Sequence, residues 1–260
     1  MTSQERLMYQ ILGSISNTDT PLVFKGALIV KLLLAEHGYT MIERATKDID
    51  ANWIGTPPTN DVLVETINNA LKEYNNDLYA ELRREYSKDR TARIVIIDTN
   101  TKDELVSMDI NINPVIGNRV YYYGGVKIKG VLPNEILADK INVLSGTKIF
   151  RRMKDFIDVY ALSHCVKVET SEIFDFCNKK GYKLGNFNEV YNKVDGKDGI
   201  KHAYSKWKGV EGKPDFDVIY SYMSKFLYPF AERNVTNGVW NNNTLTWINK
   251  QKNKINNYLL

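Results

Sequence analysis

The chain has 260 residues, of which 43% are hydrophobic, and a formal net charge of +4 at neutral pH. This length and composition can form one large or two modest domains with a packed core. No apolar run approaches the roughly 20 residues that span a bilayer, and the N-terminus lacks a signal-peptide pattern. We therefore predict a soluble, cytoplasmic protein with no membrane partner.

The first predicted elements are a helix, a short strand and a second helix. Thr2 and Glu5 have the spacing of a capping box, which predicts an amphipathic helix to about residue 15. A strand at 22–24 ends at Gly26, where an apolar helix over 27–37 follows. A glycine turn before a helix N-terminus offers backbone N–H groups to a phosphate, although such a glycine can also serve the backbone alone.

The next predicted strand, residues 46–54, carries two carboxylates. Alternate side chains of a strand share a face, so Thr46, Asp48, Asp50 and Asn52 point to one side. Carboxylates this close repel each other, and a hard cation such as Mg²⁺ stabilises both in the ionised form. A solvated acidic strand explains the same pattern, so the pair alone leaves both interpretations open.

Sheet-forming patterns continue to residue 128. A helix over about 60–74 precedes predicted strands at 79–86, 93–98 and 105–113, and a hairpin is predicted around Gly124-Gly125. The strand at 105–113 places Asp109 on one face with Asn111 and Asn113. Either Asp109 is a third carboxylate beside Asp48 and Asp50, or this strand is an edge strand with a polar outer face.

After Pro133 the pattern is helical almost throughout. Asn134 is the predicted N-cap of a helix over 135–144, in which Lys140 falls within an apolar stripe. Its ammonium can extend to water or contact an anion.

In a helix over about 150–165, Asp155 and Asp158 share one facet, either as a solvated patch paired with nearby basic residues or as part of a site. A loop at 194–199 and an Asn-rich tail from 234 are predicted next. Cys165 and Cys177 lack metal-ligand spacing, which indicates buried, reduced thiols.

Charge differs between the two halves of the chain. Residues 1–135 contain 15 Lys or Arg and 18 Asp or Glu, whereas residues 136–260 contain 20 and 13. The basic second half would suit a phosphate-rich partner such as RNA. Its aromatic residues either stack on bases or belong to the core, and include Tyr182, Tyr191, Tyr204, Trp207, Tyr220 and Tyr222.

Four ordered motifs between residues 22 and 162 resemble the polymerase-β-type nucleotidyltransferases, and specifically the AbiEii/AbiGii toxin family. The motifs are Phe24-Lys25-Gly26-Ala27, Arg44-x-Thr46-x-Asp48-Ile49-Asp50, Ile136-Leu137-Ala138-Asp139-Lys140-Ile141 and Arg151-x-x-Lys154-Asp155-Phe156-Ile157-Asp158-Val159-Tyr160-x-Leu162.

This resemblance implies an α+β fold, with a mixed-sheet, polymerase-β-like nucleotidyltransferase domain at 1–133 and an α-helical domain at 134–260. The helical domain would contribute Lys140 and Asp158 to a cleft between the two. The implied activity is Mg²⁺-dependent transfer of a nucleoside monophosphate from an NTP, with Mn²⁺ as a possible substitute, to an acceptor such as tRNA. The implied setting is the toxin half of a toxin–antitoxin or abortive-infection system with a cognate antitoxin.

The resemblance also implies roles for residues, all of them hypotheses at this point. Asp48 and Asp50 would bind metal, Lys140 would hold the triphosphate, and Asp158 matches the later acidic motif. Asp109 is our candidate for a third catalytic or metal-binding carboxylate. Nucleotide or phosphate contacts would come from the first two motifs, through Lys25, Gly26, Ala27, Arg44 and Thr46.

One position departs from the family pattern. Ala27 stands where the family usually shows a second glycine or a serine. Alanine donates a backbone N–H but offers no hydroxyl. This departure keeps open an alternative, a catalytically inactive nucleotide- or RNA-binding module on the same fold. A purely protein-binding antitoxin partner would need neither the carboxylates nor Lys140.

Overall fold

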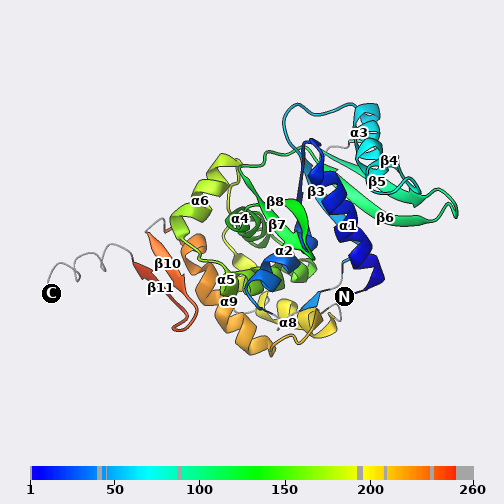
Figure 1. Cartoon of the computed structure of the whole chain (residues 1–260). Helices are drawn as coiled ribbons and strands as arrows, with labels where there is room; N and C mark the ends of the chain where they lie inside the picture. Colours follow the sequence, from blue (N-terminus) through cyan, green and yellow to red (C-terminus); the bar gives the residue numbers. More distant parts are fainter. Residues whose placement is uncertain are drawn as a thin grey trace. The chain divides into compact units, whose positions relative to one another are not determined.

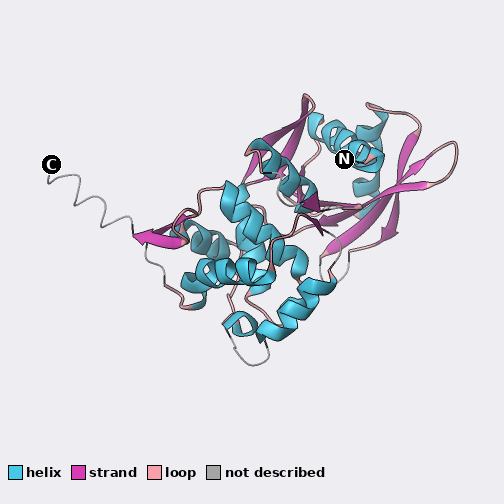
Figure 2. Cartoon of the chain, turned by 90° about the horizontal axis from the view of Figure 1, so that it is seen from below, coloured by secondary structure: helices cyan, strands magenta, loops and turns pink. Residues whose placement is uncertain are grey.

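The computed structural model describes residues 2–39, 43–44, 46–86, 90–191, 196–207, 210–234 and 237–249. The chain divides into two compact units, one formed by Met1–Leu33 and Ala45–Leu132, the other by Leu34–Arg44 and Pro133–Leu260. The fold is α+β, with a mixed seven-stranded sheet in the first unit and mainly helices in the second (Figures 1 and 2). Within the described ranges, no helix has both the length and the apolar character needed to cross a membrane.

The first unit combines the sheet with helices, and the helix α2 continues into the second unit. The elements are α1 (Ser3–Asn17), β1 (Leu22–Lys25), α2 (Gly26–Glu36), β3 (Asp48–Trp53), α3 (Asn60–Lys72), β4 (Leu78–Arg84), β5 (Thr91–Asp98), β6 (Glu104–Asn111), β7 (Asn118–Tyr123) and β8 (Val126–Val131). The strand order is β4-β5-β6-β3-β1-β8-β7. The β3–β6 and β1–β8 pairs are parallel and the other pairs are antiparallel.

One face of the sheet forms the core of the first unit. Ile49, Met108 and Ile94 occupy one cross-strand row and are fully buried. Helices α1 and α3 pack against each other and against the sheet, and Figure 1 shows α3 beside β4 and β5. The predicted capping box of α1 is confirmed, because the side chains of Thr2 and Glu5 each accept from the other's backbone N–H. The opposite face of the central strands carries the polar residues.

The second unit is built mainly of helices, which Figure 2 shows in cyan. Its elements after α2 are β2 (Glu43–Arg44), α4 (Pro133–Leu144), the 3₁₀ helix η1 (Ile149–Arg151), α5 (Met153–Cys165), α6 (Thr170–Lys179), α7 (Asn188–Tyr191), α8 (Gly196–Lys206), β9 (Val210–Glu211), α9 (Phe216–Ala231), β10 (Gly238–Asn241) and β11 (Thr246–Asn249). Strand β2 pairs with β9, and β10 pairs with β11.

Several local predictions are confirmed. Gly124 and Gly125 join β7 to β8 with φ angles of 51° and 85°, as a two-residue turn with two left-handed positions requires. Cys165 and Cys177 are both free, and burial raises the pKa of each thiol to about 11, so both stay protonated at neutral pH. Cys177 is buried, whereas Cys165 is only partly covered.

Three predictions about the second unit are wrong. Helix α4 begins at Pro133, so Asn134 is a helical residue that bonds to Glu172 and not an N-cap. The predicted loop at 194–199 is helical from Gly196 on, while residues 194–195 lie outside the described part. The predicted Asn-rich tail contains the hairpin β10–β11. This hairpin packs on α9 through Trp240 and Trp247, whose ring centroids each lie within 5.5 Å of the centroid of Phe226.

Candidate active site

The glycine turn and the second carboxylate of β3 are in direct contact. Strand β1 pairs with β3 so that Lys25 lies opposite Asp50, and Gly26 then begins α2 with a φ of 71°. A Cβ atom added to Gly26 would lie 2.1 Å from Oδ2 of Asp50. The Asp50 carboxylate therefore lies against the Cα of Gly26, at the N-terminus of α2. Only glycine meets both the backbone and the space requirement here.

The first carboxylate, Asp48, lies at the start of β3 and is exposed. Ser107, its register partner on β6, donates a hydrogen bond from Oγ to Oδ1 of Asp48. Thr46 donates to the backbone carbonyl of Asp48 at 3.3 Å. These contacts fix the strand end while the carboxylate stays open to solvent, so Asp48 can bind a ligand without unfolding any packed element.

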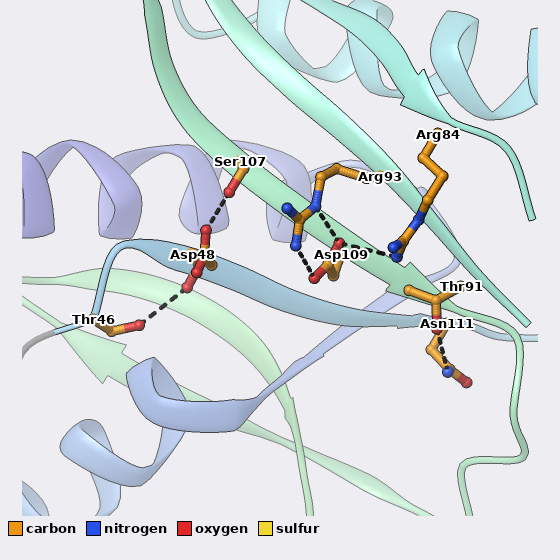
Figure 3. Close-up of polar contacts among 8 residues, drawn as sticks. All are labelled: Thr46, Asp48, Arg84, Thr91, Arg93, Ser107, Asp109 and Asn111. Carbon is orange, nitrogen blue, oxygen red and sulfur yellow. Dashed lines mark hydrogen bonds and ion pairs between the residues drawn. The ribbon is translucent and has the colours of Figure 1, made fainter. Parts of the chain in front are cut away.

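Asp109 lies directly beside Asp50 because β6 is the parallel neighbour of β3. The edge-strand interpretation is wrong, since β6 lies between β5 and β3. Arg93 of β5 donates from Nε to Oδ1 of Asp109 at 2.8 Å and from Nη2 to Oδ2 at 2.7 Å, and Arg84 of β4 is 3.9 Å from Oδ1 (Figure 3). Asp109 thus lies next to Asp50, and its carboxylate has a bidentate arginine partner.

All three carboxylates affect the pKa of Arg93. Its hydrogen bonds to Asp109 raise the pKa of the guanidinium, and the negative charges of Asp109, Asp48 and Asp50 raise it further. Sequence reasoning missed this residue, although strand alternation in β5 places Arg93 opposite Asp109 once the β5–β6 register is known.

The donor set suits a hard divalent cation that is shared with a substrate. Among the described residues, no group of three or more His, Cys, Asp or Glu side chains is arranged to hold a metal ion. Mg²⁺, however, is usually bound by one or two protein carboxylates together with waters and substrate phosphates. Asp48 and Asp50 supply two carboxylates on one face, and Asp50 lies at a helix N-terminus, where phosphate also binds favourably.

Lys140 and Asp158 lie in the second unit and contact each other. Nζ of Lys140 donates to Oδ2 of Asp158 at 2.7 Å and to Oδ1 of Asp155 at 3.0 Å. The side chains of Lys140 and Asp158 are only 11% and 6% exposed. The Lys140 ammonium therefore does not extend to water, and the Asp155–Asp158 facet is not a solvated patch, because α4 supplies its cation.

A second buried charge network on α4 was not anticipated from the sequence. Lys180, at the C-terminal end of α6, forms ion pairs with the fully buried Glu135 at 2.8 Å and with Asp139 at 2.6 Å. Tyr182 donates a hydrogen bond to the same Asp139 oxygen. Helix α4 is thus joined to α5 by one ionic cluster and to the end of α6 by another.

The remaining predicted nucleotide contacts are Lys25, Ala27 and Arg44. Lys25 is the register partner of Asp50, and Ala27 follows Gly26 in the first turn of α2 and is buried. Arg44 pairs with Val210 through β2 and β9 of the second unit, and its side chain lies outside the described part.

The aromatic residues proposed for base stacking belong mainly to the core. Tyr204 and Tyr222 are buried, and the hydroxyls of Tyr191 and Tyr220 donate to backbone carbonyls. Two other aromatic side chains of the described second unit are exposed instead, Phe150 of η1 at 43% and Tyr228 of α9 at 56%.

Phe150 lies within a short basic segment, which we define as residues 148–154. Its exposed cations are Lys148, Arg151, Arg152 and Lys154. None of these four forms an ion pair within the described part of the chain. The Arg151 guanidinium lies 5.6 Å from the centroid of the Phe150 ring. Glu189 fixes the backbone of the segment by accepting from the N–H groups of Lys148 and Ile149.

Comparison with known proteins gives a family and two similar structures. The sequence model described as nucleotidyl transferase AbiEii toxin, Type IV TA system, matches residues 6–219. The chain is similar to MenT4, a nucleotidyltransferase toxin from Mycobacterium tuberculosis H37Rv, with 10% identity over 89% of this chain and 91% of that chain, at a TM-score of 0.46. It is also similar to an antigenic nucleotidyltransferase-like protein from Paracoccidioides brasiliensis, with 13% identity over 76% and 92% of the two chains, at a TM-score of 0.44. No curated protein matches the chain significantly.

Proposed function

The chain belongs to the AbiEii family of nucleotidyltransferase toxins, and from this premise we propose that it transfers a nucleoside monophosphate from an NTP to an RNA end, with tRNA as the acceptor. The observation that carries the proposal is the contact between the Gly26 turn and Asp50, two residues from the exposed Asp48. This arrangement presents helix N–H groups and two carboxylates together. That combination suits a phosphate and its counter-cation.

The proposed reaction exchanges one phosphoester bond for another. The acceptor hydroxyl oxygen bonds to the α-phosphorus, the bond from that phosphorus to the bridging oxygen breaks, and pyrophosphate leaves. Asp48 and Asp50 would hold Mg²⁺, or Mn²⁺ in its place, and this ion would supply neutralisation of the triphosphate charge. Asp109 is the proposed acceptor of the hydroxyl proton, since it is the register neighbour of Asp50.

Phosphate contacts are proposed for the first turn of α2. The N–H groups of Gly26 and Ala27 would donate to phosphate oxygens, with the charge of Lys25 nearby, because the N-terminal N–H groups of a helix lack intrahelical acceptors. Arg44 and Thr46 remain predicted nucleotide contacts. The roles of Lys140 and Asp158 toward the triphosphate also remain hypotheses, and their mutual ion pair supports a structural role as the alternative.

The basic segment 148–154 supports RNA as the acceptor class. Unpaired cations beside an exposed aromatic ring suit single-stranded RNA, since cations contact phosphates and the ring stacks on a base. We propose that Phe150 stacks on a base of the RNA and that Arg152 contacts its backbone. Transfer of this kind inactivates an essential RNA, which fits a toxin whose cognate antitoxin restrains it in the cytoplasm.

The experiment incubates the protein with each α-³²P-labelled NTP, Mg²⁺ and total tRNA, alongside an Asp48→Asn variant. Label on RNA that requires Asp48 supports the proposal and identifies the base that is transferred. Saturable NTP or RNA binding without label or pyrophosphate release would favour the inactive binding module that Ala27 leaves open.

A matched pair of variants tests the RNA surface. Phe150→Ala should raise the KM for RNA about tenfold while leaving the KM for NTP unchanged, because base stacking contributes roughly 1–3 kcal/mol. Tyr228→Ala, which removes a 56% exposed ring from α9, should change neither. Equal effects of both variants would contradict the assignment of the basic segment.

A further inference from the structure

A row of charged residues crosses five strands of the sheet. In strand order β1, β3, β6, β5 and β4, the register partners are Lys25, Asp50, Asp109, Arg93 and Arg84. Directly opposed residues of neighbouring strands share a face, so the row lies on the polar face of the sheet. Its two carboxylates are therefore flanked by cations on both sides.

The contact between Arg93 and Asp109 has a defined geometry. Two parallel N–H···O bonds of 2.8 and 2.7 Å join the guanidinium to both oxygens of the carboxylate. A fork of this kind fixes the plane and the direction of the carboxylate, which a single contact from a lysine does not do. Each carboxylate oxygen keeps a second lone pair, so Asp109 can still accept a proton.

A second arginine of the same sheet provides a comparison within the structure. Arg83 contacts Glu81 at 2.7 Å and Glu104 at 2.6 Å. Its side chain is 41% exposed, against 42% for Arg93. The two arginines thus have similar exposure and each has close carboxylate contacts. They differ in their surroundings, because Arg93 also lies within electrostatic reach of Asp48 and Asp50.

We infer that Arg93 is a positioning residue of the transfer reaction, which holds the Asp109 carboxylate in place beside Asp50. The inference rests on the proposed nucleotidyl transfer. Without Arg93, Asp109 would be repelled by Asp50 and Asp48 and would turn away from them. Arg93 acts through Asp109 and does not itself touch the reacting atoms, so its loss should slow the chemical step and leave NTP binding intact.

The test compares Arg93→Gln, Arg93→Lys and the control Arg83→Gln, each also measured for its urea midpoint. We expect Arg93→Gln to lower kcat about 10- to 100-fold, as is typical for residues that orient a reacting group, with the KM for NTP unchanged. Arg93→Lys should recover part of the loss, and Arg83→Gln should match wild type. Calorimetry should give the same Kd for an α,β-methylene NTP analogue in the wild type and in all three variants.

A double variant shows whether Arg93 acts through Asp109. If it does, Arg93→Gln should add no further loss of kcat in an Asp109→Asn background. Full additivity of the two losses, or a kcat for Arg93→Gln equal to that of Arg83→Gln, overturns the inference while the proposed function stands. Wild-type protein that transfers no nucleotide under any condition overturns the proposed function, and the inference with it.

Discussion

The carboxylate–cation cluster on the sheet and the one between α4 and α5 differ in access to solvent. On the sheet, Arg93 and Asp109 are 42% and 24% exposed. Between α4 and α5, Lys140 and Asp158 are 11% and 6% exposed. The two clusters thus have similar charges and similar contact distances but differ in exposure to solvent. We expect removal of a carboxylate to have different effects in the two environments.

From this comparison we propose that exposure distinguishes a cluster that takes part in transfer from one that stabilises the fold. Breaking a buried pair leaves an uncompensated charge in a low-dielectric interior, whereas an exposed pair is screened and contributes little to stability. We therefore expect substitutions in the sheet cluster to change transfer, and substitutions in the α4–α5 cluster to change the free energy of unfolding.

The largest effect is expected for Asp48→Asn. Loss of this carboxylate should lower the transfer rate roughly 10³-fold, since charge stabilisation by a bound cation accounts for several kcal/mol of the barrier. The free energy of unfolding should change by less than about 1 kcal/mol, because Asp48 is exposed and its removal relieves repulsion with Asp50. Labelled transfer and urea unfolding measure the two quantities. Transfer at the wild-type rate would show that Asp48 is not part of the active site.

The next effect is on stability. Asp158→Ala should lower the free energy of unfolding by about 3 kcal/mol, because it removes the shorter and more deeply buried of the two ion pairs that join Lys140 to α5. The matched control is Asp175→Ala in α6, which breaks an exposed i,i+4 pair with Lys179 and should cost about 0.5 kcal/mol or less. Urea titration of both variants checks this. Similar losses would mean that burial does not separate the two kinds of cluster.

Alanine substitutions at two glycines test the contact between the Gly26 turn and Asp50. Gly26→Ala and Gly38→Ala both place alanine at a positive φ, 71° and 64°, which costs roughly 1–2 kcal/mol each. Only the Cβ at 26 meets the Asp50 carboxylate, whereas nothing lies within 4 Å of a Cβ at 38. Gly26→Ala should therefore lose transfer and Gly38→Ala should retain it, as single-turnover assays can determine. Equal activity would show that the turn at 26 serves the backbone alone.

The smallest effect concerns pH. His164 stacks on Tyr222 in the second unit, and burial lowers the pKa of its imidazole below the ordinary value. The unfolded chain then binds the proton more readily than the folded one, so the free energy of unfolding should fall as pH drops below about 6.5. His164→Gln should flatten this dependence, and the exposed His202→Gln should not. Parallel slopes for both variants would assign the dependence to other groups.

Local chemistry determined what the sequence could predict. The capping box at Thr2, the two-glycine turn and the shared face of Asp48 and Asp50 each depend on residues close in the chain, and all three are present. The family resemblance added the order of the motifs and the fold class.

Long-range pairing determined what the sequence could not predict. Arg93 meets Asp109 only through the β5–β6 register, and Lys140 meets Asp158 only through the packing of α4 on α5. The hairpin β10–β11 depends on tryptophans that pack on a helix, so a short Asn-rich segment with no strong strand pattern gave no signal of it. Tertiary contacts overrode local preference at each of these places.

The most direct test of the account measures labelled transfer and the free energy of unfolding together in Asp50→Asn and Asp158→Asn. We predict opposite outcomes: Asp50→Asn folds as stably as wild type and transfers no nucleotide, while Asp158→Asn is destabilised and, where folded, transfers nucleotide. An Asp50→Asn variant that transfers at the wild-type rate would contradict the account.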